Sequence, residues 1–313
     1  MKLSVLIRSS AIEALNFSKE NKKKLEDLLP DIDVIVHNTP KSFRDDLSDV
    51  DIALVWNFKP SWIKRAPILK WIAVPSAGTD YMSKDDYPER IKFTNSTFHG
   101  KIMAETVLGA MLGFSRGLFW NIKNFNEFQW PRNQIDNYST TLKGSHLAIL
   151  GYGHIGRYIA ELAKPFGVRI TGIKRTMTKK PSFFEENDKI ITIESLDSIL
   201  PYVDHLVVVL PRTESTNNII EKERLNLLPK KAYLYNIGRG NAINEAALID
   251  SLNQEKISGA YLDVFENEPL ADDSPLRKCP NIVLTPHSSA IAPNFLNLFI
   301  DEFVERYKKW IAT

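Results

Sequence analysis

The chain has 313 residues, 43% of them hydrophobic, which is enough to bury two cores and predicts two domains rather than one. Its 40 basic and 38 acidic side chains give a formal net charge of +2, which offers no electrostatic case for binding nucleic acid or a membrane surface. No run of about 18 apolar residues is free of charge, so we expect no membrane span. The single cysteine, Cys279, excludes an internal disulfide, and the first apolar run is too short for a secretion signal. These features favour a cytoplasmic protein.

The first 98 residues alternate between short apolar runs and charged stretches. The runs LSVLI, IDVIV, IALVW and KWIAV predict strands, and residues 19–29 carry apolar side chains at helical spacing. This alternation indicates a mostly parallel sheet with helices between its strands. Residues 102–118 then predict a long helix that leads into a second domain.

The second domain is expected to contain six strands: HLAIL, VRITGI, HLVVVL, AYLYNI, SGAYLDV and NIVLT. Helices are predicted at residues 155–166, 196–202, 221–227 and 245–252, and a final amphipathic helix at 295–311. If this last helix packs on the first domain, that domain comprises residues 1–98 plus 291–313 and the other comprises 99–290. We therefore predict an α/β fold with two doubly wound parallel-sheet domains, Rossmann-like or flavodoxin-like, and an active site in the cleft between them.

A glycine fingerprint, GYGHIG, follows the predicted strand HLAIL and precedes a helical pattern. In this context the glycines allow a tight turn and let the backbone approach a dinucleotide pyrophosphate. The alternative is a structural turn that binds no ligand. The predicted cofactor contacts in this loop are Gly151, Tyr152, Gly153, His154, Ile155 and Gly156.

The strand VRITGI is followed by Lys174, Arg175 and Thr176. A carboxylate at this point would accept hydrogen bonds from a free ribose 2′-hydroxyl, whereas lysine and arginine favour a 2′-phosphate. The sequence thus predicts a preference for NADPH over NADH. A solvated basic turn is the alternative, since Lys179 and Lys180 are close by.

Three further residues carry the chemistry: Arg239 in NIGRG, Glu268 in DVFENEP and His287 in LTPHSSA. A guanidinium can fix a carboxylate substrate, an imidazole can move a proton, and a carboxylate can hold that imidazole oriented and charged. Together they predict a hydride-transfer site. The alternatives are a surface turn charge for Arg239, a loop histidine bonded to backbone for His287 and an ordinary exposed acid for Glu268.

These motifs, with SAGTD at residues 76–80, LPRTEST from 210, GAYLDVFENEP from 259 and TPHSSA from 285, span nearly the whole chain. In this order they resemble the D-isomer-specific 2-hydroxyacid dehydrogenase family, which includes glyoxylate/hydroxypyruvate reductases and D-lactate dehydrogenases. The resemblance implies that Arg239 binds the substrate carboxylate and 2-oxygen, that His287 is the general acid/base and that Glu268 pairs with it. It further implies that Ser76, Ala77 and Gly78 turn backbone N–H groups toward the substrate carboxylate.

The resemblance also assigns contacts to the cofactor and to a second subunit. The expected cofactor contacts are Leu210 and Pro211 near the adenine, Thr216 near the phosphates, the backbone of Ile237, and Asp263 at the nicotinamide carboxamide. Asp263 has an alternative role as a strand-end cap. A homodimer through the cofactor domains is implied, to which rings at Trp120, Phe125, Phe128 and Trp130 contribute unless they pack within the subunit.

Other residues are expected to be structural. Trp56 is expected to pack in a core, His146, His154 and His205 to be structural or solvent-facing, and no cluster has metal-ligand spacing, so no metal is predicted.

The leading hypothesis is NADPH-dependent reduction of a small 2-oxoacid, glyoxylate-like or hydroxypyruvate-like, to the D-2-hydroxyacid, with NAD as a possible cofactor. The alternatives are an NAD-dependent D-lactate or D-2-hydroxyacid dehydrogenase, and a non-catalytic dinucleotide-sensing protein of the corepressor type. We expect no disordered interaction segment, which speaks against the latter.

Overall fold

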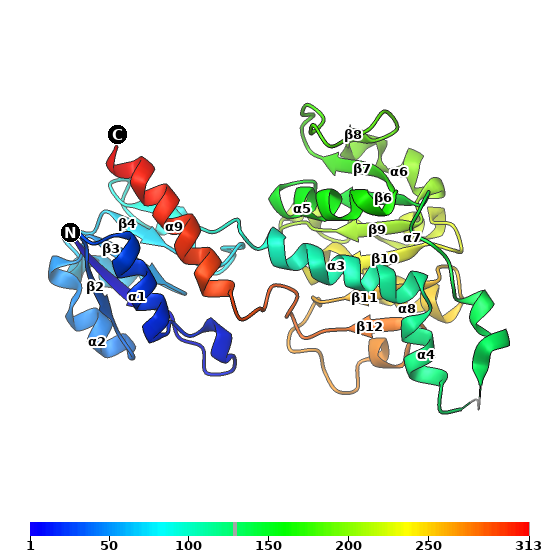
Figure 1. The fold of residues 1–313 in the computed structure, drawn as a ribbon, viewed down its shortest axis with the longest axis horizontal. Coiled ribbons are helices and arrows are strands. Elements are labelled where there is room, and N and C mark those ends of the chain that lie inside the picture. Colours follow the sequence, from blue (N-terminus) through cyan, green and yellow to red (C-terminus); the bar gives the residue numbers. More distant parts are fainter. Residues whose placement is uncertain (128–129, 313) are drawn as a thin grey trace. The chain divides into compact units, whose positions relative to one another are not determined.

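The structure is a computed structural model that describes residues 1–127 and 130–312, and the chain divides into two compact units (Figure 1). The first unit contains Met1–His99 and Ile291–Thr313, and the second contains Gly100–Ala290. His99, which the sequence analysis assigned to the second domain, therefore lies in the first unit.

The first unit is built on a parallel sheet with the strand order β2-β1-β3-β4-β5. The C-terminal helix α9 packs against α1 and covers β4, where Phe303 and Trp310 contact Trp71 at ring-centroid distances of 5.1 and 5.3 Å. The last residues of the chain thus complete the core of the first unit. Its elements are β1 (Lys2–Leu6), α1 (Lys19–Leu28), β2 (Asp33–Val36), α2 (Pro40–Asp45), β3 (Ile52–Val55), β4 (Trp71–Ala73), β5 (Lys92–Thr94) and α9 (Phe295–Ile311).

The second unit contains a parallel sheet with the order β12-β11-β10-β9-β6-β7-β8. From β6 the strands are added toward one edge as far as β8, and from β9 they are added toward the other edge, as in a doubly wound dinucleotide-binding fold. The strands are β6 (His146–Leu150), β7 (Arg169–Lys174), β8 (Lys189–Thr192), β9 (His205–Val208), β10 (Tyr233–Asn236), β11 (Gly259–Leu262) and β12 (Ile282–Leu284). The helices are α3 (Gly100–Ser115), α4 (Leu118–Asn124), α5 (His154–Ala163), α6 (Leu196–Ile199), α7 (Lys222–Leu227) and α8 (Glu245–Asn253).

The predicted α/β class with two parallel sheets is confirmed. The single helix predicted at residues 102–118 is wrong, because the chain bends between α3 and α4 at Gly117, whose φ of 63° is unfavourable for residues with a side chain. The helices predicted at 155–166 and 196–202 end early in 3₁₀ turns that contain Pro165 and Pro201. Strands β5 and β8 were not predicted.

The central strands of the second unit are buried on both faces, which explains their continuous apolar sequences. Every residue of β6, β9 and β11 is buried. Because all strands are parallel, the loops after β6, β9, β10, β11 and β12 leave the same edge of the sheet. These loops, together with the end of β7 and the loop after it, carry the predicted cofactor and catalytic residues.

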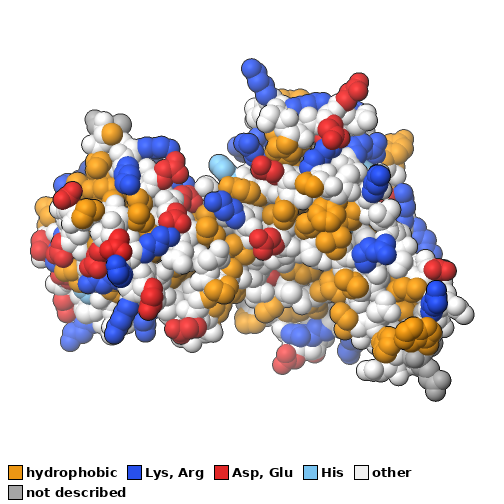
Figure 2. Space-filling view, viewed as in Figure 1, with side chains coloured by type: hydrophobic (Ala, Val, Ile, Leu, Met, Phe, Trp, Pro, Cys, Tyr) orange, Lys and Arg blue, Asp and Glu red, His pale blue; other side chains and the backbone are white. Residues whose placement is uncertain are grey.

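The aromatic residues expected at a subunit interface divide into two groups. Trp120 stacks on Tyr138 within the subunit, with ring centroids 4.6 Å apart, whereas Phe125 and Trp130 are exposed. Phe128 lies outside the described residues. Figure 2 shows hydrophobic side chains gathered over α4, among which Leu118 and Ile122 are also exposed.

Within the described part of the chain, no helix combines the length and the apolar character needed to cross a membrane.

Candidate active site and cofactor loop

The loop from β6 to α5 passes tightly beside the end of β9. Gly151 has a φ of 97°, and a Cβ there would lie 2.3 Å from the Val209 carbonyl oxygen, so only glycine fits. At Gly156 a Cβ would meet Gly151 O and Ile149 Cγ2 at 3.0 Å, which keeps α5 close to β6. The N-cap residue Gly153 offers no side-chain cap, so the first-turn amides of α5 are left to an anionic ligand. This geometry fits a dinucleotide pyrophosphate.

The side chains of this loop do not all face the same way. Tyr152 is buried, and its ring fills a notch at Gly172 of β7, where a Cβ would lie 2.6 Å from Tyr152 Cγ. Burial raises the pKa of the Tyr152 phenol. His154 is exposed and Ile155 is half-buried. The Tyr152 side chain therefore packs the loop against β7, and only the backbone of Tyr152 is left to contact a ligand.

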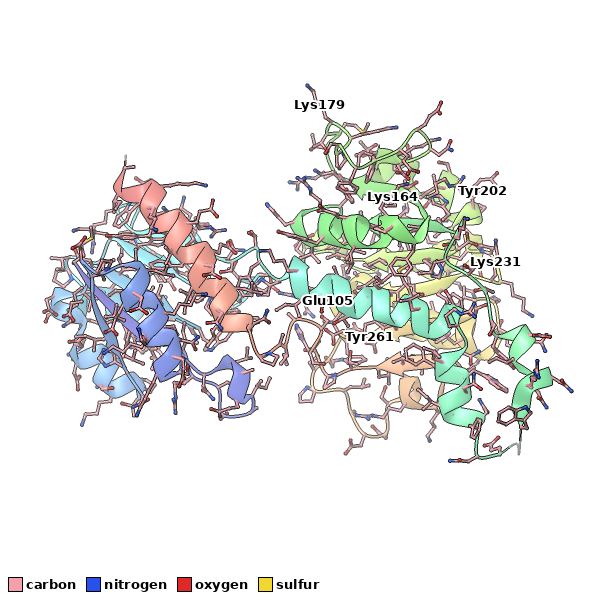
Figure 3. The ribbon with its side chains drawn as sticks, viewed as in Figure 1. Glu105, Lys164, Lys179, Tyr202, Lys231 and Tyr261 are labelled. Carbon is pink, nitrogen blue, oxygen red and sulfur yellow. The ribbon has the colours of Figure 1, made fainter. Side chains whose placement is uncertain are left out.

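The basic residues begin at Lys174, the last residue of β7, and continue into an exposed loop. Lys174 is half-buried and its Nζ lies 3.4 Å from Thr178 Oγ1, while Arg175 and Thr176 are exposed. Figure 3 shows Lys179 projecting from the same loop. At the far end of the loop, Asp188 is buried and pairs with Lys164 at 2.7 Å. This ion pair thus holds the far end of the basic loop, residues 175–188, at the C-terminal end of α5.

The loop after β9 contains the residues expected near the adenine and phosphates. Leu210 is half-buried, Pro211 is exposed and Thr216 is buried. The Thr216 hydroxyl lies 2.7 Å from Pro211 O and accepts a hydrogen bond from Thr213 N at 2.9 Å. It consequently stabilises the shape of this loop.

Arg239 follows β10 and is held in place by the two glycines beside it. A Cβ on Gly238 would lie 2.6 Å from Leu210 N, and a Cβ on Gly240 would lie 1.8 Å from Phe265 C. The Arg239 backbone is therefore packed between the loop after β9 and the loop after β11. Its half-buried guanidinium donates to Gly238 O at 2.9 Å. The preceding Ile237 is buried and donates its N–H to Val208 O at 3.2 Å.

His287 and Glu268 form a hydrogen-bonded pair. His287 Nδ1 lies 2.7 Å from Glu268 Oε2, and Glu268 Oε1 accepts a hydrogen bond from Phe265 N at 3.0 Å. The His287 side chain is 52% exposed and that of Glu268 is 34% exposed. Since Nδ1 faces the carboxylate, Nε2 is the nitrogen that can meet a substrate. The structure thus joins two residues predicted from separate motifs.

Asp263 shapes the backbone around His287. Its fully buried carboxylate accepts hydrogen bonds from Thr285 Oγ1 at 2.6 Å and from the N–H groups of Ser288 and Ser289 at 2.8 and 3.0 Å. Its carbonyl accepts from His287 N at 2.8 Å. His287 itself has a left-handed backbone with a φ of 51°. These contacts fit the strand-end role given to Asp263 as an alternative, and its contact with the nicotinamide carboxamide stays a prediction.

In the first unit, the predicted substrate loop follows β4. Ser76 O accepts a hydrogen bond from Ser96 N at 3.0 Å, and Ala77 O accepts one from Asn95 Nδ2 at 2.5 Å. Both carbonyls are thus tied to the segment after β5, which favours the opposite orientation for the N–H groups of Ala77 and Gly78. Sequence reasoning missed Asn95 and Ser96, because a polar pair after a short strand gives no motif.

Tyr81 was also missed, and its hydroxyl lies 2.6 Å from Ser76 Oγ. The only signal in the sequence is its position in the same loop, just after SAGTD.

Trp56 donates its Nε1–H to Leu15 O at 3.3 Å and packs near Phe295, which agrees with its expected packing role.

His146 and His205 lie in buried positions, in agreement with the structural role expected for them. His146 is buried between Tyr202 O and Thr171 Oγ1, at 3.0 and 2.8 Å, and His205 is buried beside the Tyr235 hydroxyl at 2.9 Å. Burial lowers the pKa of both imidazoles. Among the described residues, no group of three or more histidine, cysteine, aspartate or glutamate side chains is arranged to hold a metal ion.

Comparison with known proteins connects this geometry to a family. The sequence model of the D-isomer specific 2-hydroxyacid dehydrogenase NAD-binding domain matches residues 108–289. Glyoxylate/hydroxypyruvate reductase A of Salmonella typhimurium is 31% identical over 256 residues, covering 79% of this chain and 78% of that protein. D-3-phosphoglycerate dehydrogenase of Methanocaldococcus jannaschii is 28% identical over 276 residues, or 87% of this chain, and the chain spans 52% of its length.

A solved structure agrees with the sequence matches over almost the entire chain. The D-isomer specific 2-hydroxyacid dehydrogenase from Xanthobacter autotrophicus Py2, in complex with NADPH and MES, is 29% identical with a TM-score of 0.78. The alignment covers 98% of this chain and 95% of that one. With the family sequence model matching more than half of its length, the chain belongs to the D-isomer specific 2-hydroxyacid dehydrogenase family.

Proposed function

We propose that the protein reduces a small 2-oxoacid to the D-2-hydroxyacid, with NADPH as the preferred cofactor. The observation that carries this proposal is the His287–Glu268 pair at 2.7 Å. Glu268 follows β11, which pairs with the strand before Arg239, and His287 follows β12, the next strand of the sheet. The proposed catalytic residues are those predicted from the sequence: Arg239, Glu268 and His287.

The proposed mechanism assigns one task to each residue. When bound, the nicotinamide supplies a hydride to the second carbon of the substrate. Negative charge then develops on the carbonyl oxygen, and the Arg239 guanidinium stabilises it more strongly than it stabilises the ground state. His287 delivers a proton to this oxygen from Nε2. Glu268 holds the imidazole through Nδ1, and the N–H groups of Ala77 and Gly78 hold the carboxylate.

The cofactor is proposed to bind along the loops at the edge of the second sheet. The uncapped start of α5 and the glycine turn at Gly151 fit the pyrophosphate. Lys174 and Arg175 are proposed to hold the 2′-phosphate, since a guanidinium and an ammonium form charge-assisted bonds with it. That the related Xanthobacter dehydrogenase carries NADPH supports this preference.

Substrate size and assembly complete the proposal. The relationship to a glyoxylate/hydroxypyruvate reductase favours glyoxylate or hydroxypyruvate as the substrate. We further propose a homodimer through the cofactor domains, because the exposed Ile122, Phe125 and Trp130 offer apolar area around α4. Light scattering that gives a monomer at working concentration would reject this assembly.

A steady-state assay tests the enzymatic proposal. The oxidation of NADPH and of NADH is followed with glyoxylate, hydroxypyruvate and pyruvate, and kcat/KM is compared for each pair. We expect turnover of at least one 2-oxoacid, faster with NADPH, and a selective loss of the NADPH reaction in Arg175→Ala. Better turnover with NADH contradicts the cofactor preference. No oxidation of either cofactor contradicts the enzyme and favours a dinucleotide-sensing role.

A further inference from the structure

The substrate loop after β4 carries a pair of hydroxyl groups to which no role has been given above. Ser76 Oγ and the Tyr81 hydroxyl lie 2.6 Å apart. A turn in which Met82 N donates to Thr79 O at 2.9 Å brings the chain back, so that Tyr81 reaches Ser76. The Tyr81 side chain is 52% exposed and Ser76 is half-buried. The pair is therefore accessible to a small molecule.

Both ends of this loop are fixed to the first unit. Ser96 N donates to Ser76 O, and Ser96 Oγ in turn donates to Val74 O at 2.9 Å. Met82, which follows Tyr81, is buried in the cluster that contains Tyr87 and Ile91. A hydroxyl pair held in this way is positioned before a ligand arrives, which is what a selective contact requires.

The pair lies next to the atoms proposed to hold the substrate carboxylate. Ser76 directly precedes Ala77 and Gly78, whose N–H groups have that proposed role. Since the carboxylate of a 2-oxoacid is two bonds from its third carbon, we place a substituent on that carbon beside the pair. Within the pair one hydroxyl donates its hydrogen to the other, and a hydroxyl oxygen has two acceptor lone pairs, so the pair can also accept a hydrogen bond from a substrate hydroxyl. A methyl group has no hydrogen to donate.

We propose that Tyr81 is a specificity-determining residue, which together with Ser76 selects 2-oxoacids that carry a hydroxyl group on the third carbon. Hydroxypyruvate is the smallest such acid. This inference rests on the proposed reductase function and narrows its substrate class. It assigns Tyr81 no part in the proton or hydride transfer. Loss of the phenol hydroxyl should therefore change the relative kcat/KM of the substrates without stopping the reaction.

The test compares three substrates in Tyr81→Phe. With NADPH, we expect kcat/KM for hydroxypyruvate to fall about tenfold, the scale of one lost hydrogen bond, while the values for glyoxylate and pyruvate stay within about twofold. Ser76→Ala should likewise lower the substrate ratio, which is kcat/KM for hydroxypyruvate divided by kcat/KM for pyruvate. The matched control is Tyr87→Phe, which removes a buried hydroxyl that donates to Phe58 O at 2.6 Å in the same unit. This control should lower the melting temperature and leave the substrate ratio unchanged.

Other outcomes overturn the inference. An equal loss with all three substrates in Tyr81→Phe means a structural role, and an unchanged hydroxypyruvate ratio means no role. If Tyr81→Phe does not fold, the ratio in Ser76→Ala decides by the same criterion. Failure of the underlying reductase function is distinct, because the wild-type protein would then oxidise NADPH with none of the three acids.

Discussion

His287 combines a left-handed backbone with a side chain oriented by Glu268. The φ of 51° is unfavourable for most residues, and the hydrogen bonds from His287 N, Ser288 N and Ser289 N to Asp263 maintain it. Asparagine adopts this backbone more readily than alanine does. The backbone conformation and the imidazole chemistry can therefore be tested separately at one position.

We expect His287→Ala and His287→Asn both to lower kcat by about two to four orders of magnitude, because neither can transfer the proton. His287→Ala should also lose about 1 kcal/mol of unfolding free energy through backbone strain, whereas His287→Asn should lose less. Steady-state kinetics and urea unfolding measure the two effects. Near-normal turnover in either variant contradicts the assignment of His287 as the general acid.

At the scale of elements, the loops after β10 and β11 are packed against each other at Gly240. A Cβ there would overlap the backbone of Phe265 and Glu266, at 1.8 Å from Phe265 C and 2.3 Å from Glu266 N. The displaced loop is the one that carries Glu268, whose Oε1 is bonded to Phe265 N. Position 240 thus connects the placement of Arg239 with that of the His287–Glu268 pair.

Gly240→Ala is expected to lower both kcat and stability, the latter by roughly 1–3 kcal/mol as for other overpacked sites. Gly109→Ala is the matched control, since a Cβ on this exposed glycine of α3 would meet nothing within 4 Å. It should leave kcat unchanged and stabilise the helix by about 0.5–1 kcal/mol. Normal kinetics in Gly240→Ala would show that the two loops are not coupled.

The sequence predicted long apolar strands and the C-terminal helix well, because each has a clear periodicity. It failed at β5 and β8, which are short and begin with a lysine, and at Gly117, whose backbone angle depends on packing. The pairing of His287 with Glu268 followed from motif resemblance. The hydrogen bond from Asn95 Nδ2 to Ala77 O could not be predicted, because it joins two loops whose relative position is determined by the pairing of β4 with β5.

For the molecule as a whole, each unit contains a buried neutral histidine. Burial lowers the pKa of His99 in the first unit and of His205 in the second to about 4. Between this value and the ordinary pKa of 6.5, the unfolded chain binds more protons than the folded one. Their contribution to stability is therefore complete above pH 6.5 and is lost as the pH falls toward 4.

We expect the free energy of unfolding to decrease between pH 6.5 and 4, by an order of 3 kcal/mol per histidine. In His205→Gln, which keeps a hydrogen-bonding side chain beside Tyr235 but cannot titrate, the decrease should be smaller. Urea unfolding at a series of pH values measures both slopes. Identical slopes in the two proteins would contradict the role of His205.

The return of α9 to the first unit has a consequence for biosynthesis. The second unit is one continuous segment. In the first unit, Trp71 is not covered until Phe303 and Trp310 have been synthesised. Glu302 of α9 also accepts hydrogen bonds from Thr97 N and Phe98 N, next to the segment that ties the substrate loop. On the ribosome, the second unit can therefore complete its fold first, whereas Thr97 and Phe98 gain their contacts with Glu302 only when α9 emerges.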